Sequence, residues 1–238
     1  NRIYLHDLEQ SALDWDTYAN ENRVALKQPN ELYDHQKHAL AAVQQGLEEE
    51  GRGKLVMACG TGKTLTSLRI AEELAGAGKR VLYLVPSLAL MSQTVREWTN
   101  DATLPLCSYA VCSDTNVGKR RASDDSAEIN IHDLAYPATT DAKTLADKFA
   151  QHDNEQDMHI VFSTYQSIQA VSEAQKEHGL PEFDLIVCDE AHRTTGAITD
   201  ESDESNFVKV HYQDFIHGKK RLYMTATPRV FADQVKNK

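Results

Sequence analysis

A short glycine-rich segment carries the residue types that phosphate binding requires. It is Cys59-Gly60-Thr61-Gly62-Lys63-Thr64. Glycines permit a tight turn whose backbone N–H groups converge on phosphate oxygens, and a following helix N-terminus reinforces that arrangement. Lys63 would then contact the β- and γ-phosphates, and the Thr64 hydroxyl would bind Mg²⁺. The whole loop, with Cys59, Gly60, Thr61 and Gly62, is predicted to hold ATP and Mg²⁺.

A second segment places two carboxylates directly after an apolar run. Asp189 and Glu190 follow Leu185-Ile186-Val187-Cys188. Asp189 suits a Mg²⁺ ligand, and Glu190 suits the group that polarises an attacking water. An acidic pair at a strand end is often only a solvated turn. Together with the upstream phosphate loop, however, the pair favours hydrolysis of a nucleoside triphosphate, with Lys63, Asp189 and Glu190 as catalytic residues.

The elements around these segments alternate between short apolar runs and amphipathic stretches. Strands are expected at 55–58, 81–85, 109–111, 160–162, 185–188 and 221–224, and helices at 36–47, 65–75, 89–98 and 165–176. Near-continuous apolar strands separated by helices predict an α/β fold with a mostly parallel sheet covered on both faces. Lys63 and Glu190 are then expected to face each other at the tips of adjacent strands.

The domain organisation is expected to be simple. Residues 1–30 show no clear period and are interpreted as a segment that continues from an upstream domain, and residues 31–238 as one ATPase domain. The stretch 113–156 is polar, with a basic run at 119–121, and is expected to be a surface insertion carrying one helix near 141–151. The acidic run 200–204 is expected to be a second exposed loop.

Composition narrows the class of protein. The 238 residues are 41% hydrophobic, which suffices for a sizeable core, and the longest apolar runs have strand length rather than membrane-span length. The four cysteines lack zinc or disulfide spacing, so a cytoplasmic location is expected. A net charge of −11 argues against a basic protein that coats DNA without regard to sequence. It does not exclude DNA binding through backbone N–H and hydroxyl groups.

The order of Gly-Thr-Gly-Lys-Thr and Asp-Glu-Ala-His resembles superfamily 2 helicases and translocases of the DEAH type. The resemblance spans about residues 30–230 and implies a RecA-like P-loop NTPase domain. Gln36, in the segment 32–37, matches the glutamine that reads adenine in this superfamily, while Tyr33 and His35 occupy the places of its usual arginine and tyrosine. Gln36 also suits a polar residue at a helix start.

Three further segments match the superfamily in order. Pro86-Ser87 resembles motif Ia and Thr164-Tyr165 resembles motif Ib or Ic, whose loops touch the nucleic-acid backbone. Ser87 would equally cap the following helix in any protein. The segment 224–229 resembles motif III, which implies that the hydroxyls of Thr225 and Thr227 bond the His192 ring and couple the nucleotide site to movement.

The residues in and around the motifs resemble those in the motor of type ISP restriction–modification enzymes and of related type I subunits. The resembling stretches are 188–196, 205–211 and 220–229. This implies the first motor lobe of an ATP-dependent translocase on double-stranded DNA, accompanied by nuclease or methyltransferase modules. A second RecA-like domain, expected outside this chain, would supply arginine fingers, so the isolated chain is expected to hydrolyse ATP weakly.

The sequence is also compatible with other functions. A strand-separating repair helicase would use the same motor, and no residue separates it from a translocase. An ATP-gated DNA-binding switch is a further alternative, although the intact Glu190 argues against it. A small-molecule kinase on the same phosphate loop is disfavoured because it needs no coupling hydroxyls.

Overall fold

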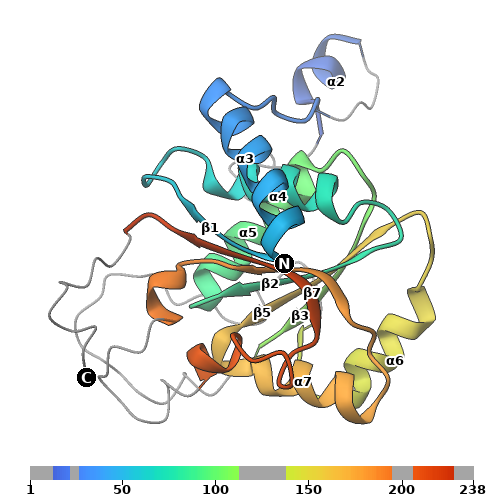
Figure 1. Ribbon diagram of the computed structural model, residues 1–238. Coiled ribbons are helices and arrows are strands. Elements are labelled where there is room, and N and C mark those ends of the chain that lie inside the picture. Colours follow the sequence, from blue (N-terminus) through green and yellow to red (C-terminus); the bar gives the residue numbers. More distant parts are fainter. Residues whose placement is uncertain (1–12, 22–26, 113–137, 195–205, 228–238) are drawn as a thin grey trace, which may run out of the picture.

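The structure is a computed structural model that describes residues 13–21, 27–112, 138–194 and 206–227 (Figure 1). Its centre is a seven-stranded sheet in the order β1-β7-β6-β2-β5-β3-β4. The strands are β1 (Arg52–Val56), β2 (Arg80–Val85), β3 (Leu106–Val111), β4 (Ala138–Thr139), β5 (Met158–Thr164), β6 (Phe183–Cys188) and β7 (Gly218–Thr225). Every neighbouring pair is parallel, so the predicted parallel α/β sheet is confirmed.

Helices cover both faces of the sheet. The described helices are α2 (Trp15–Glu21), which lies apart from the sheet in Figure 1, α3 (Asp34–Glu50), α4 (Lys63–Leu74), α5 (Leu88–Asp101), α6 (Ala142–His152) and α7 (Ile168–Glu177), with 3₁₀ turns η2 (Tyr165–Ser167) and η3 (Ala191–Thr194). The apolar sides of α3, α4 and α5 pack on one face, and those of α6 and α7 pack on the other (Figure 1). The sheet is therefore the middle of three layers.

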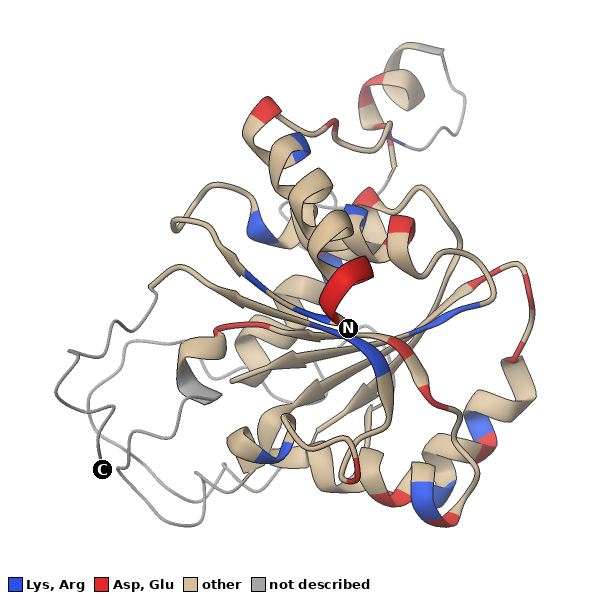
Figure 2. Cartoon of the chain, viewed as in Figure 1, with Lys and Arg blue, Asp and Glu red and all other residues tan. Residues whose placement is uncertain are grey.

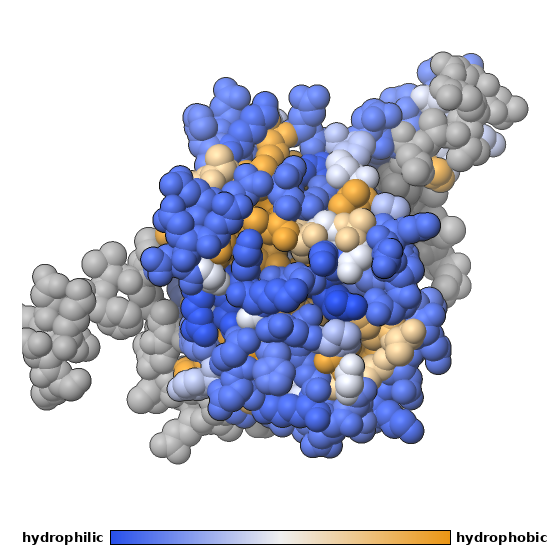
Figure 3. Space-filling model, turned by 45° about the vertical axis from the view of Figure 1, so that its right-hand side comes forward, coloured by the Kyte–Doolittle hydropathy of each residue, from blue (hydrophilic) through white to orange (hydrophobic). Residues whose placement is uncertain are grey.

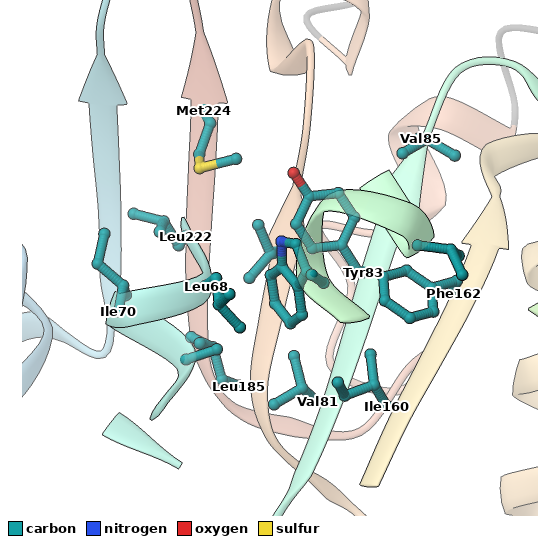
Figure 4. Packing of buried hydrophobic residues seen from close by; sticks show 14 of the residues in the cluster. Leu68, Ile70, Val81, Tyr83, Val85, Ile160, Phe162, Leu185, Leu222 and Met224 are labelled. Carbon is teal, nitrogen blue, oxygen red and sulfur yellow. The ribbon is translucent and has the colours of Figure 1, made fainter. Parts of the chain in front are cut away.

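The central strand β2 is buried on both faces. Its residues from Val81 to Val85 are 0% exposed and alternate between the two apolar clusters. On the α5 side, Tyr83 and Phe162, labelled in Figure 4, both pack edge-on against Trp98, with centroid distances of 5.0 and 5.6 Å from the indole. Such aromatic pairs add about 1 kcal/mol each beyond the area they bury. This packing fixes the strands whose carboxyl ends carry the candidate site.

The expectation that Lys63 and Glu190 lie at the tips of adjacent strands is wrong. The phosphate loop follows β1 and Glu190 follows β6, but β7 lies between these two strands and pairs with both. The last strand of the described ranges thus enters between two earlier ones. Because all three strands run parallel, their carboxyl ends still meet at one edge of the sheet.

The region 113–156, expected to be a surface insertion, is described only in part, and the helix predicted near 141–151 is confirmed as α6. Residues 113–137 lie outside the described part of the chain, as do residues 200–204. Residues 138–139 form β4 at the edge of the sheet, and α6 buries Leu145 and Phe149 to 1% and 2% exposure. The stretch 138–152 therefore belongs to the sheet and its helical layer, because α6 has an apolar side that the polar average of the region conceals.

Smaller differences concern the ends of elements. Helix α3 continues past the expected end at residue 47 to Glu50, and its C-cap is Gly51, whose φ of 67° lies in the left-handed region. The helix expected from Tyr165 begins with the 3₁₀ turn η2 before α7. The segment before residue 31 carries α2, and Asn30 donates from N and Nδ2 to the Asp101 carboxylate over 3.1 and 2.6 Å. The division at residue 30 stays a prediction.

The surface is mixed in charge. Acidic and basic residues are interspersed over the described helices and strands (Figure 2), and the face in Figure 3 is mostly hydrophilic with smaller apolar areas. None of the helices in the described ranges combines the length and apolarity that a membrane span requires.

Candidate nucleotide site

The phosphate loop connects the end of β1 to the start of α4. Gly60 and Gly62 have φ values of 75° and 79°, in the left-handed region that favours glycine. The Thr61 hydroxyl donates to the Ala58 carbonyl over 2.7 Å and closes the turn. Helix α4 begins at Lys63, and the first N–H groups of a helix lack partners within it. The loop therefore presents Cys59, Gly60 and a helix N-terminus, an arrangement that suits an anion.

Gln36 joins helix α3 to this loop. Its side chain is 2% exposed; Oε1 accepts from the Tyr33 N–H over 2.8 Å, and Nε2 donates to the Thr61 carbonyl over 3.2 Å. The Tyr33 and His35 rings lie beside it and stack with an interplanar angle of 9°. Gln36 is thus a polar residue at a helix start that also contacts the phosphate loop. Its contact with adenine stays a prediction.

Asp189 lies directly after β6 and is 8% exposed. Burial raises the pKa of its carboxyl to about 6, an effect that the hydrogen bond from the Glu190 N–H opposes, while the charge of Glu190 adds to it and that of Lys63 opposes it. A buried carboxylate with a raised pKa gains most from a cation, since ionisation without one is costly. This chemistry fits the Mg²⁺ that Asp189 and Thr64 are predicted to bind.

Glu190 has an unusual backbone conformation. Its φ of 50° makes it the one non-glycine residue with positive φ within the described ranges. Such a conformation costs about 1–3 kcal/mol and persists only where the surroundings hold it. Its N–H donates to Asp189 Oδ1 over 2.9 Å, and its carboxylate Oε2 lies 3.1 Å from His192 Nδ1. The contacts around the residue therefore fix the carboxylate at the edge of the sheet.

His192 links β6 to β7. Its Nδ1 lies 3.1 Å from the hydroxyl of Thr225, which is 0% exposed, so the expected contact between this ring and motif III is present. Thr227 contributes differently from the expectation, because its backbone N–H donates to the Thr225 hydroxyl over 3.2 Å. A coupling role for His192, Thr225 and Thr227 stays a prediction.

The residues expected to touch nucleic acid divide into two groups. Tyr165 is 0% exposed and Thr164 is 6% exposed. The prediction that these two side chains contact a nucleic-acid strand directly is therefore wrong. The Tyr165 hydroxyl donates to the Asp189 carbonyl over 2.8 Å, and the Thr164 hydroxyl donates to Ser167 Oγ over 3.1 Å. Burial raises the pKa of the Tyr165 hydroxyl well above its usual range, so it remains a donor.

The loop after β2 has a different character. Pro86 is buried, whereas Ser87 is exposed and accepts a hydrogen bond from the Leu90 N–H over 3.4 Å. Ser87 is thus the N-cap of α5, which was the alternative to a nucleic-acid contact. Because the cap leaves the residue exposed, contact of Pro86 and Ser87 with a strand stays a prediction.

Two buried polar residues of the sheet were not singled out from the sequence. Tyr83 in β2 is 0% exposed, and burial, with the negative charge of Asp189 next, raises the pKa of its hydroxyl (Figure 4). Arg221 in β7 is 2% exposed and donates to the carbonyls of Val210, Gly218 and Ile216. For Arg221 the available signal was a charged residue within an apolar strand, which indicates a specific buried hydrogen-bonding role.

Comparisons with known proteins agree with this geometry. Residues 30–230 match the family model described as "Type III restriction enzyme, res subunit". The solved structure of the ATP-dependent type ISP restriction-modification enzyme LlaBIII bound to DNA is 43% identical, with a TM-score of 0.81 over 95% of this chain and 15% of that one. A nuclease-deletion mutant of the type ISP enzyme LlaGI with a DNA substrate mimic is 43% identical, with a TM-score of 0.68 over 85% of this chain and 18% of that one.

A curated relative comes from a virus. The probable helicase A859L of African swine fever virus (isolate Tick/Malawi/Lil 20-1/1983) is 33% identical over 213 residues, which are 88% of this chain and 20% of that protein. The chain thus spans about a fifth of this relative and less of the two type ISP enzymes.

Proposed function

The chain belongs to the family of the type III restriction enzyme res subunit, which is helicase-like, and we propose that it is the first motor lobe of an ATP-dependent DNA translocase in a restriction–modification enzyme. One observation carries the proposal. The phosphate loop after β1, the Asp189–Glu190 pair after β6 and Thr225 at the end of β7 share one edge of the sheet. In open α/β sheets this edge is where ligands bind.

Each group of residues at this edge would have its own role in ATP hydrolysis. The loop from Cys59 to Gly62 and the start of α4 would bind the phosphates through N–H groups, with Lys63 beside the β- and γ-phosphates. Thr64 and Asp189 would hold Mg²⁺, which neutralises developing charge when bound. Glu190 would orient the attacking water and accept its proton. His192, between Glu190 and Thr225, would report the state of the γ-phosphate to β7.

Double-stranded DNA is the proposed partner. The related type ISP structures contain DNA or a DNA substrate mimic, as their descriptions state. The exposed Ser87 lies at the carboxyl edge of the sheet, where hydroxyl and N–H groups can bind phosphate without reading sequence. A second RecA-like lobe with arginine fingers and the nuclease or methyltransferase modules belong to the same proposal for the whole protein. A cytoplasmic location stays a prediction.

Turnover of ATP by the whole protein, with and without double-stranded DNA, tests the proposal. We expect DNA to raise the turnover strongly, and we expect residues 1–238 alone to bind nucleotide weakly and to turn it over poorly. Displacement of a triplex-forming strand would mark translocation, and unwinding of a duplex would mark the alternative of a strand-separating helicase. Nucleotide-dependent DNA binding without turnover would mark a switch, and phosphate transfer to an added acceptor a kinase.

A further inference from the structure

The peptide bond between Asp189 and Glu190 is held from both of its polar ends. Its carbonyl oxygen accepts the Tyr165 hydroxyl over 2.8 Å, and its N–H donates to Asp189 Oδ1 over 2.9 Å. The orientation of this peptide fixes φ of Glu190, which is 50°. Because few φ values are open to a non-glycine residue in this region, the two bonds together select the direction in which the Glu190 side chain leaves the backbone.

The Tyr165 hydroxyl reaches this peptide from a different strand. Tyr165 is the first residue after β5, and β2 lies between β5 and β6 in the sheet. Its ring is fully buried and stacks on Phe207 with centroids 4.6 Å apart, so it has little freedom to move alone. The hydrogen bond therefore couples the backbone at the end of β5 to the backbone of Glu190.

We propose that Tyr165 is a positioning residue that sets the aim of Glu190 and ties it to the loop after β5. This inference rests on the proposed function, in which Glu190 orients the attacking water. The loop after β5 leaves the sheet at the same carboxyl edge as the exposed Ser87. DNA bound along this edge shifts the loop that carries Tyr165, and the buried hydroxyl passes that shift to the Asp189–Glu190 peptide. Tyr165 itself touches neither DNA nor nucleotide.

Replacement of one hydroxyl tests this role. Tyr165→Phe keeps the ring on Phe207 and removes only the hydrogen bond. In the whole protein at saturating ATP and DNA, we expect kcat to fall about tenfold, which corresponds to about 1.4 kcal/mol of barrier. KM for ATP and the affinity for a non-hydrolysable ATP analogue should stay within about twofold, because Tyr165 makes no ground-state contact with nucleotide. The rate without DNA should change less than the stimulated rate.

The chain offers a matched control. Tyr109 is also buried, stacks on Phe149 with the same interplanar angle of 29°, and its hydroxyl accepts from Cys107 Sγ over 3.2 Å on the remote strand β3. Tyr109→Phe should leave kcat and DNA stimulation unchanged. Combining Tyr165→Phe with Glu190→Gln should produce no loss beyond that of Glu190→Gln, because both changes act through one carboxylate.

Several outcomes would overturn the inference while leaving the proposed function intact. These are an unchanged kcat in Tyr165→Phe, an equal fractional loss with and without DNA, a parallel loss in nucleotide affinity, or additive effects with Glu190→Gln. A wild-type protein that shows no DNA-stimulated turnover would instead contradict the proposed function itself. The two failures are therefore distinguishable.

Discussion

The Nδ1 atom of His192 lies 3.1 Å from the hydroxyl of Thr225, so the segment after β6 is bonded to the end of β7. We predict that Thr225→Val, which keeps the shape and removes the hydroxyl, separates ATP turnover from movement. Turnover should fall by less than about tenfold, the effect of one hydrogen bond, while translocation should be lost. Triplex displacement measured beside ATP turnover checks this.

A control for this variant lies in α5. The Thr99 hydroxyl donates to the Val95 carbonyl over 2.7 Å within that helix. Thr99→Val should keep turnover and translocation in their normal ratio. If Thr225→Val also kept that ratio, the proposed coupling through His192 would be wrong.

Asp189→Asn should stabilise the protein in the absence of Mg²⁺ and nucleotide while abolishing turnover. Burial raises the pKa of Asp189 from 3.8 to about 6, so the folded state disfavours the ionised carboxylate. The resulting cost grows as pH rises through this window and reaches at most about 3 kcal/mol above pH 6. The variant's gain in Tm should therefore be largest near pH 8 and small near pH 4.

Asp184 provides the comparison of opposite sign. Burial opposes its ionisation, but hydrogen bonds from Lys219 over 2.7 Å and from the Arg80 N–H over 3.0 Å lower its pKa. Stability from this group is present above the unfolded pKa and is lost as pH falls through the folded pKa. Asp184→Asn should thus lower Tm at pH 8 and have less effect in acid. Changes in Tm of the same sign for Asp189→Asn and Asp184→Asn at pH 8 would contradict the opposite pKa shifts assigned to these two carboxyls.

Gly62→Ala should weaken nucleotide binding more than Gly60→Ala does. Both glycines have φ between 75° and 79°, so each alanine pays a similar backbone cost of about 1–2 kcal/mol. A Cβ at Gly62 would overlap Gln36 Nε2, whereas one at Gly60 meets nothing within 4 Å. Only the first variant displaces the Gln36 amide. Titration with a fluorescent ATP analogue compares the two, and equal losses would show that Gln36 does not support the loop.

Arg221→Met should destabilise the fold by at least about 3 kcal/mol. Arg221 is 2% exposed, and its guanidinium donates hydrogen bonds to the carbonyls of residues 210, 216 and 218 and to the Gln213 amide oxygen. Each buried acceptor that loses its donor costs about 1–3 kcal/mol of stability. Arg52, its exposed neighbour across β1 and β7, is the control. Arg52→Met should stay within about 0.5 kcal/mol of wild type in urea unfolding. Similar losses in both variants would contradict this account of Arg221.

The two motifs could be predicted from the sequence because each consists of contiguous residues. Glycines before Lys63 predict a turn at the start of a helix, and the apolar run before Asp189 predicts a strand that ends in polar residues. Both motifs lie where they were expected relative to their own strands. The alternation of apolar strands and amphipathic helices also sufficed for the parallel sheet with two covered faces.

The remainder depends on tertiary structure. No local pattern indicates that β7 enters between β1 and β6, because strand order is decided by how the crossovers pack. Tyr165 was expected at a nucleic-acid surface because its segment resembles motif Ib or Ic. Its burial depends on the packing of Phe207 and Asp189 around it, which no local pattern indicates. The helix predicted near 141–151 is present as α6, but its packing on the sheet was not predicted, because long polar stretches flank its apolar side.

The central claim is that Lys63 and Glu190 act on one ATP molecule at the shared edge of the sheet. Its most direct test is DNA-stimulated ATP turnover and ATP-analogue binding by the whole protein, comparing wild type with Lys63→Ala and Glu190→Gln. We predict that Glu190→Gln binds the analogue normally and loses at least about a hundredfold in kcat, and that Lys63→Ala loses binding as well. Turnover that persists near the wild-type rate in both variants would contradict the account.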